Sequence, residues 1–193
     1  MTERETLALY EKTGALMHGH FRLTSGLHSD VYLQSALVLQ HPESAAALGQ
    51  ALAAAFGGVG ATTEIYTLSL HDALPILVAH EVARALGARC LFTERENGVM
   101  TLRRGFSVAP GERCLVVEDV ITTGGSTREV FECMKRHGAL VVGVGSLIDR
   151  SAGAARFPVT QVALARVGAT TWTPEACPLC KSGSPAVKPG SRA

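Results

Sequence analysis

The stretch CLVVEDVITTGGST, residues 114–127, decides the fold of this chain. Residues 114–117 form a continuous apolar run, typical of a strand buried on both faces of a sheet. An amphipathic segment around residues 128–136 predicts a helix ending at Gly138, and the apolar run 140–148 predicts a second buried strand. Strand, loop, helix and strand in this order form a βαβ unit, which predicts a right-handed crossover and a parallel sheet.

The flanking segments extend this unit into one α/β domain. Residues 42–56 predict a helix, since a proline stands at its first turn and apolar residues recur at helical spacing. A second helix is expected at residues 77–86 and a short strand at 88–92. Asn97-Gly98 is a turn signal that predicts a hairpin or mobile loop before residues 99–104. Thr2 and Glu5 have the spacing of a helix-capping box.

Composition and charge exclude several classes of function. The chain carries 18 basic and 17 acidic residues, a formal charge of +1, so no global field attracts nucleic acid or an anionic membrane. No apolar run is long enough to span a bilayer, and the charged N-terminal residues do not resemble a signal peptide. We therefore expect a cytoplasmic protein whose five cysteines are reduced thiols.

The loop that follows the 114–117 strand has the chemistry of a phosphate site. Its glycines allow successive backbone N–H groups to turn inward, its hydroxyls add donors, and the helix beginning near Thr127 adds a positive end. Ligands of open α/β sheets sit outside the carboxyl ends of the strands, which is where this loop is expected. The patterns of a Walker loop and of a dinucleotide fingerprint are both absent.

Two acids, Glu118 and Asp119, precede this phosphate loop. Carboxylates accept hydrogen bonds from the paired hydroxyls of a ribose, and they help to hold Mg²⁺ directly or through water. The loop thus suits a sugar at one end and a phosphate at the other. The alternative interpretation is an ordinary strand-to-helix turn, in which glycine and threonine are common. That interpretation does not account for the pair of acids.

The segment 116–127 resembles the phosphoribosyl pyrophosphate (PRPP) signature of the type I phosphoribosyltransferases. Residues 19–33 resemble the N-terminal hood of the orotate phosphoribosyltransferase family, and residues 146–150 (SLIDR) resemble the strand end whose arginine contacts orotate there. The resemblance covers roughly residues 5–63 and 77–180. It implies the type I fold, a mostly parallel twisted sheet flanked by helices, in one domain over residues 1–170. The hood comes largely from residues 1–40, and a loose tail, residues 171–193, follows.

The resemblance also implies an activity and a set of roles. The reaction transfers the phosphoribosyl group of PRPP to orotate, giving orotidine 5′-monophosphate and pyrophosphate, with Mg²⁺ as cofactor, in the pyrimidine pathway. A homodimer is implied too. The PRPP ligands would be Glu118, Asp119, Val120, Ile121, Thr122, Thr123, Gly124, Gly125, Ser126, Arg95 and Arg103. The orotate ligands would be Thr122, Arg150, Tyr32 and Leu33.

Two groups of arginines have competing interpretations. Arg150 follows an apolar strand and Asp149; it either pairs with that aspartate or offers its planar guanidinium to the orotate carboxylate. Arg95, Arg103 and Arg104 flank the Asn97-Gly98 turn, as a solvated basic hairpin or as a loop that closes over the pyrophosphate. Arg95 and Asp119 are the expected catalytic residues.

Cys177 and Cys180 form a lone CxxC pair. A structural zinc site needs four ligands, and the other cysteines lie in core-like runs. His18, His20 and His28 are expected to be surface or hood residues, because no second ligand cluster is evident. The sequence assigns no residue as a direct metal ligand, and the alternative is that two copies of the chain pair their CxxC segments around a shared ion.

Residues 64–76 (EIYTLSLHDALPI) do not fit the family pattern. Relatives have a glycine-containing pyrophosphate loop here, and this segment has no glycine to let the backbone approach a phosphate. It also resembles translated sequencing-adapter sequence, and our hypothesis is that it replaces native residues. If the segment is native, we expect impaired turnover with PRPP binding retained.

Three alternatives stay open at this point. A purine-type phosphoribosyltransferase would share the PRPP loop but have a different hood. A regulator that senses PRPP or nucleotides would keep the fold without turnover, and an RNA-binding version would need a basic face, of which the charge balance gives no sign. An inactive homologue would follow from a native segment 64–76.

Overall fold

The computed structural model describes residues 1–23, 25–57, 65–70 and 73–189. Its main body is a six-stranded sheet of order β5-β4-β3-β6-β7-β8, parallel except for the antiparallel β4–β5 pair. The strands of this sheet are β3 (Ile65–Leu70), β4 (Cys90–Glu96), β5 (Val99–Leu102), β6 (Arg113–Ile121), β7 (Leu140–Asp149) and β8 (Thr160–Arg166). The predicted α/β fold class is confirmed.

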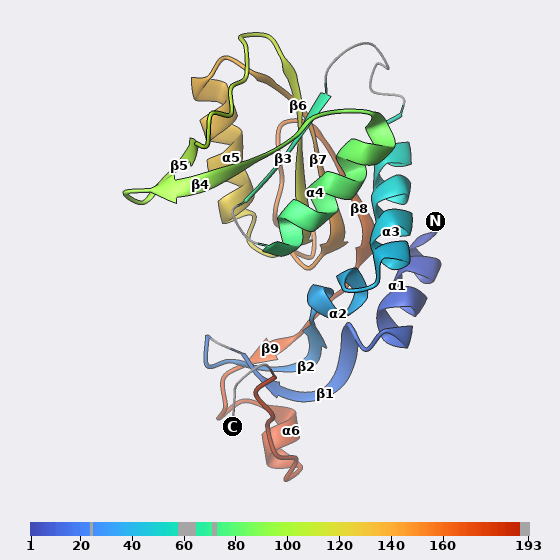
Figure 1. The fold of residues 1–193 in the computed structure, drawn as a ribbon. Helices are drawn as coiled ribbons and strands as arrows, with labels where there is room; N and C mark the ends of the chain where they lie inside the picture. Colours follow the sequence, from blue (N-terminus) through green and yellow to red (C-terminus); the bar gives the residue numbers. More distant parts are fainter. Residues whose placement is uncertain (24, 58–64, 71–72, 190–193) are drawn as a thin grey trace.

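Helices cover both faces of this sheet (Figure 1). One core cluster packs α3 (Pro42–Ala55) and α4 (Ala73–Leu86) against one face of β6 and β7. A second cluster packs α5 (Gly125–Arg136) against the other face. The central strands are therefore buried on both sides, as their continuous apolar sequences predict.

A smaller three-stranded sheet of order β1-β2-β9 forms the hood. Its elements are β1 (Leu16–Arg22), β2 (His28–Leu33) and β9 (Thr171–Trp172), with α1 (Glu3–Lys12) before it, α2 (Ser35–Leu39) after the hairpin and α6 (Pro178–Lys181) in the tail. The capping box of α1 is confirmed, because Thr2 and Glu5 exchange both hydrogen bonds. In Figure 1 the hood sheet lies between the six-stranded sheet and α6.

The tail is more ordered than the sequence predicts. β9 pairs with β2, and Val187 forms backbone hydrogen bonds of 2.8 Å with both His20 and Arg22 of β1. Polar composition suggested a loose segment after residue 170, but backbone pairing with the hood holds it in place through residue 187. The hood is therefore built from both ends of the chain.

Several element boundaries differ from the predictions by a few residues. β6 continues four residues past Val117 and includes Glu118 and Asp119, and α5 begins at Gly125, before Thr127. α4 begins at Ala73, which places Pro75 in the first helical turn, where its missing N–H has no intrahelical partner to lose. The predicted hairpin is confirmed between β4 and β5, with positive φ angles at Asn97 and Gly98.

The anomalous segment contributes to the middle of the sheet. Residues 65–70 form β3, which pairs with β4 on one side and β6 on the other, and Ala73 begins α4. Residues 64, 71 and 72, which include most of the expected pyrophosphate loop, lie outside the described residues. The prediction of a defective loop therefore stays a prediction.

Candidate active site

Gly124 makes the sharp turn between β6 and α5. Its φ of +73° lies in the left-handed region, and a Cβ there would lie 3.0 Å from Phe157 Cζ and 3.1 Å from Ala155 Cβ. Both constraints require glycine, because any larger residue would be strained and crowded at once. The turn places the N-terminus of α5 directly beside the end of β6.

The first turn of α5 has backbone donors that suit an anion. Its N-cap is Gly124, which has no side chain to cap the helix, and the first N–H groups of any helix have no intrahelical acceptor. The N–H of Gly125 donates to Thr123 Oγ1 at 3.4 Å. Thr122 and Thr123 are exposed, and Ser126 is partly exposed. Arg128 donates from Nη1 to the Thr123 carbonyl at 2.8 Å and so holds the loop in this shape. The result is a phosphate-binding helix end lined with hydroxyls.

The two acids of the loop lie in different environments. Glu118 is only 3% exposed, and Thr127 donates from Oγ1 to its Oε1 at 3.4 Å. Asp119 is partly exposed. Val120 and Ile121 complete the strand, and the Ile121 side chain is buried in the core, so that residue can meet a ligand only through its backbone. The carboxylates lie beside the phosphate loop, as predicted.

Arg150 lies next to this loop because its backbone N–H donates to the Ile121 carbonyl at 2.8 Å. Its Nε atom is buried and has no hydrogen-bond partner among the described residues. Asp149 accepts instead from the backbone N–H of Ser151 at 2.7 Å, and the described part of the chain shows no Asp149–Arg150 ion pair. The aspartate-pairing interpretation of Arg150 is therefore not supported, and the guanidinium is left with an unused donor.

The hood contributes to the same region. Burial lowers the pKa of the Arg150 guanidinium from its ordinary value, while the phenol of Tyr32 in β2 acts in the opposite direction. That electrostatic influence requires Tyr32 to lie near Arg150. Leu33 packs against the larger core cluster beside Tyr32. The structure thus brings together the strand-end arginine and the hood residues that the sequence assigned to one ligand.

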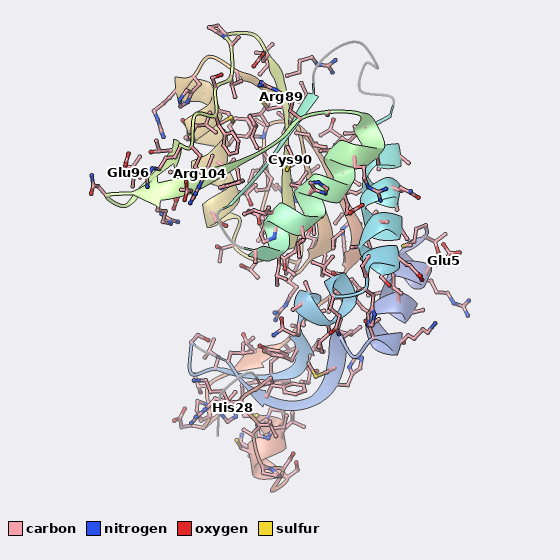
Figure 2. All side chains as sticks on the ribbon, viewed as in Figure 1. Glu5, His28, Arg89, Cys90, Glu96 and Arg104 are labelled. Carbon is pink, nitrogen blue, oxygen red and sulfur yellow. The ribbon has the colours of Figure 1, made fainter. Side chains whose placement is uncertain are left out.

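The arginines of the β4–β5 hairpin are held by acids of the same chain. Arg95 forms an ion pair with Glu129 of α5, with Nη1 and Oε2 2.6 Å apart but without hydrogen-bond geometry. Arg103 pairs with Glu96 at 3.4 Å, and Arg104 binds Glu94. In Figure 2 the labelled Glu96 and Arg104 lie on the hairpin, well away from the hood. Arg95 therefore lies against α5. Among the described residues, Arg103 contacts Glu96 of its own hairpin and not the phosphate loop of its own chain.

One group of chemically capable residues was missed at the sequence level. His20, His28, Cys177 and Cys180 bring one ligand atom each to within 4.8 Å of one another. The CxxC was noted without partners, and His20 and His28 were assigned to the hood without a role. His20 and His28 lie on the two paired strands of the β1–β2 hairpin, close to its turn. That spacing was the signal that could have indicated a pair of metal ligands.

Comparisons with known proteins agree on the family. Residues 78–160 match the model of the phosphoribosyl transferase domain. The orotate phosphoribosyltransferase of Pelotomaculum thermopropionicum is 57% identical over 192 residues, covering 100% of this chain and 99% of that protein. The protein of the same name from Thermotoga petrophila is 50% identical, covering 95% and 96%.

Solved structures show the same fold. Orotate phosphoribosyltransferase from Aeropyrum pernix superposes with a TM-score of 0.63 at 26% identity, covering 83% of this chain and 92% of that one. Adenine phosphoribosyltransferase from Trypanosoma brucei gives a TM-score of 0.62 at 17% identity, covering 82% and 79%. The second match shows that purine enzymes share the fold and says nothing about the acceptor.

Proposed function

The chain belongs to the orotate phosphoribosyltransferase family, and we propose that its active site lies where residues 118–126, Arg150 and Tyr32 meet. It is a transferase of pyrimidine biosynthesis that moves the phosphoribosyl group of PRPP to orotate, with release of pyrophosphate. Full-length identity to orotate enzymes decides between the acceptors, because the likeness to adenine enzymes is one of fold alone. The residue roles below are our proposal.

The phosphate loop holds the 5-phosphate of PRPP. The first turn of α5 offers the N–H group of Ser126, while that of Gly125 donates to Thr123 Oγ1 at 3.4 Å, and the hydroxyls of Thr122, Thr123 and Ser126 surround the phosphate. Glu118 and Asp119 accept hydrogen bonds from the ribose hydroxyls at the other end of the loop. Glu118 is the more rigid of the two because it is buried and bonded to Thr127.

Arg150 binds the orotate carboxylate. The observation that carries this assignment is its buried Nε atom, a cationic donor with no partner beside the phosphate loop. A buried donor is costly to leave unpaired, and a planar carboxylate matches the guanidinium fork. Tyr32 and Leu33 of the hood border the orotate ring, and Thr122 lies between the ring and the phosphate.

The chemistry is chiefly positioning and charge stabilisation. An orotate ring nitrogen attacks C1 of the ribose as the bond to pyrophosphate breaks, so positive charge develops on the sugar and negative charge on the leaving group. Asp119 faces the sugar, where a carboxylate stabilises the positive charge. Arg95 is the proposed cation for the pyrophosphate, which would require it to leave Glu129.

The donor set also suits Mg²⁺. Two carboxylates stand beside a phosphate site, and Mg²⁺ prefers carboxylate, phosphate and water oxygens. When bound, the ion would neutralise the pyrophosphate oxygens of PRPP. Glu118 and Asp119 would hold it directly or through water.

We further propose a homodimer in the cytoplasm. Arg103 is not brought to its own phosphate loop, and a hairpin that reaches into a neighbouring subunit would give it a ligand. Residues 1–170 would form the catalytic domain, with residues 171–193 as an appended tail. No helix in the described part of the chain is long and apolar enough to cross a bilayer.

The test is an acceptor comparison with a separate binding measurement. Orotate consumption is followed with PRPP and Mg²⁺, with adenine as the competing acceptor, and PRPP binding is measured by calorimetry. We expect PRPP to bind, orotate to be consumed and adenine to be ignored. Consumption of adenine in place of orotate would overturn the acceptor assignment, and failure to bind PRPP would overturn the site itself.

A further inference from the structure

The hood contains a group of four metal-ligating side chains from opposite ends of the sequence. His20 of β1 and His28 of β2 face Cys177 and Cys180, which flank the start of α6. His20, His28 and Cys177 are buried, and Cys180 is partly buried. In Figure 2 the labelled His28 lies on the side of the hood where α6 packs. We propose that these residues form a structural zinc site that clips the tail to the hood.

The distances within this cluster are close to those of a tetrahedral zinc site. Cys177 Sγ lies 3.5 Å from His20 Nε2, Cys180 Sγ lies 3.7 Å from the same nitrogen, and Cys180 Sγ lies 3.2 Å from His28 Nδ1. Zinc bonds of about 2.0–2.1 Å to nitrogen and about 2.3 Å to sulfur imply nitrogen–sulfur edges of about 3.6 Å. The two nitrogens are 2.8 Å apart, so that edge must open by about half an ångström, and the 3.2 Å edge between Cys180 and His28 by about 0.4 Å, to reach the tetrahedral values. All four ligand atoms lie within 4.8 Å of one another.

The hydrogen bond of His20 favours the tautomer that can bind a metal through Nε2. Its Nδ1 lies 2.8 Å from the Ser184 carbonyl oxygen, and a carbonyl can only accept, so Nδ1 carries the proton. In a neutral imidazole this leaves the lone pair on Nε2, the atom that faces the two sulfurs. A carbonyl that holds the remote nitrogen of a histidine is the usual support of a zinc ligand.

A bound zinc ion would neutralise the charge of the two cysteine thiolates. Two thiolates and two neutral imidazoles around Zn²⁺ carry no net charge, so the complete site can lie in a buried position at low electrostatic cost. The ligand set of two sulfurs and two nitrogens favours Zn²⁺ over the oxygen-preferring Mg²⁺. With four protein ligands the coordination sphere is full, which indicates a structural and not a catalytic metal.

The tail has few other contacts that would hold it against the hood. α6 has only four residues and buries none of them, and β9 has only two. Helices this short are not stable alone, and two backbone bonds from Val187 with one short strand pair give limited anchorage. A metal bound to both α6 and the β1–β2 hairpin would supply the missing stability. One chain provides all four ligands, so no second copy has to share the ion.

The first experiment measures metal in the protein without an affinity tag. The chain is produced in minimal medium supplemented with zinc, and its metal content is measured by elemental analysis and by native mass spectrometry. We expect one zinc per chain. X-ray absorption should show two sulfur and two nitrogen neighbours, and the cobalt-substituted protein should show thiolate charge transfer and the visible bands of a tetrahedral ion.

Matched variants locate the ion. His28→Asn keeps a polar atom near the Nδ1 position but removes the ligand, and Cys177→Ser with Cys180→Ser removes both sulfurs; each should lose the zinc. His28→Cys should retain it, since a thiolate can replace the imidazole. His18→Asn, on an exposed position of β1, and Cys90→Ser, outside the cluster, should keep one zinc per chain.

Removal of the metal by a strong chelator should lower the melting temperature of the unmodified chain and expose Cys180 to alkylation. The same chelator should leave the melting temperature of His28→Asn unchanged. Absence of zinc and of a cobalt spectrum from the unmodified chain would overturn the proposal. So would zinc retained by the double serine variant, or a Cys177–Cys180 disulfide in place of the metal.

Discussion

The backbone N–H of Arg150 donates to the carbonyl oxygen of Ile121 at 2.8 Å, which ties the end of β7 to the end of β6. This bond places the arginine beside the phosphate loop, and the buried Nε atom is left for a ligand. Ile121 and Arg150 are 29 residues apart in the chain, and they lie together because parallel strands end at the same edge of a sheet. Our proposal for the site assigns the acceptor and the sugar phosphate to these two strand ends.

Arg150→Ala should raise the KM for orotate by about tenfold to a hundredfold, since a hydrogen bond between charged groups contributes about 1.5–3 kcal/mol. The KM for PRPP should change less than about threefold, because Arg150 is not one of the proposed PRPP ligands. Steady-state kinetics with each substrate varied in turn measures both constants. Arg156→Ala, a nearby exposed arginine, is the control. An equal rise in both constants would contradict the role in orotate binding.

Gly124→Ala should abolish tight PRPP binding and lower the free energy of unfolding by about 1–3 kcal/mol, because it adds a Cβ at positive φ against Phe157 and Ala155. Gly125→Ala is the control for stability: the nearest atom to its added Cβ would be 3.6 Å away, in ordinary contact. Calorimetric titration with PRPP and denaturant unfolding give the two measurements. Wild-type stability of Gly124→Ala would show that the turn relaxes.

Replacement of residues 64–76 by the aligned residues of the Pelotomaculum thermopropionicum relative should raise kcat by about tenfold or more, since a misplaced pyrophosphate loop disturbs positioning at the reacting centre. The PRPP dissociation constant should change far less, because the 5-phosphate loop lies in β6 and α5. Initial rates and calorimetry on both chains test this. Recovery of the same codons from an independent isolate would refute the hypothesis that the segment is an artefact.

Arg103→Ala and Asp119→Asn should each inactivate the enzyme, and mixtures of the two should recover activity if the hairpin serves the neighbouring subunit. Random exchange makes half of the dimers mixed, each with one intact site, so the mixture should reach about a quarter of the wild-type rate. The proteins are mixed, unfolded and refolded together before assay, with each variant refolded alone as the control. No recovery in a proven dimer would place Arg103 in its own subunit's site.

Much of the phosphate loop could be predicted from the sequence, because the residues that shape it are close to one another in the chain. The glycine that requires positive φ, the uncapped helix start and the acids on the preceding strand all lie within residues 118–127. Neighbouring residues set backbone angles and donor positions without help from distant parts of the chain. The local sequence patterns predicted the ends of some helices and strands incorrectly. β6 extends to Ile121 although the acids Glu118 and Asp119 interrupt its apolar run, because pairing with β7 continues there.

The part of the hood that comes from the tail, and the cluster of two histidines and two cysteines, were decided by tertiary structure. His20 and Cys177 lie 157 residues apart in the chain, and a CxxC pair looks incomplete until the β1–β2 hairpin packs against the tail. The same holds for Tyr32 and Arg150, which are far apart in the sequence, although the pKa of the Arg150 guanidinium, lowered by burial, is raised in part by the phenol of Tyr32. Spacing and composition describe what a segment can form locally, while contacts between distant segments depend on how strands pair and layers pack. The sequence by itself therefore determined the residues and the local shape of the predicted sugar-phosphate loop. Only the tertiary structure decided which distant side chains lie beside that loop and which ones meet between the hood and the tail.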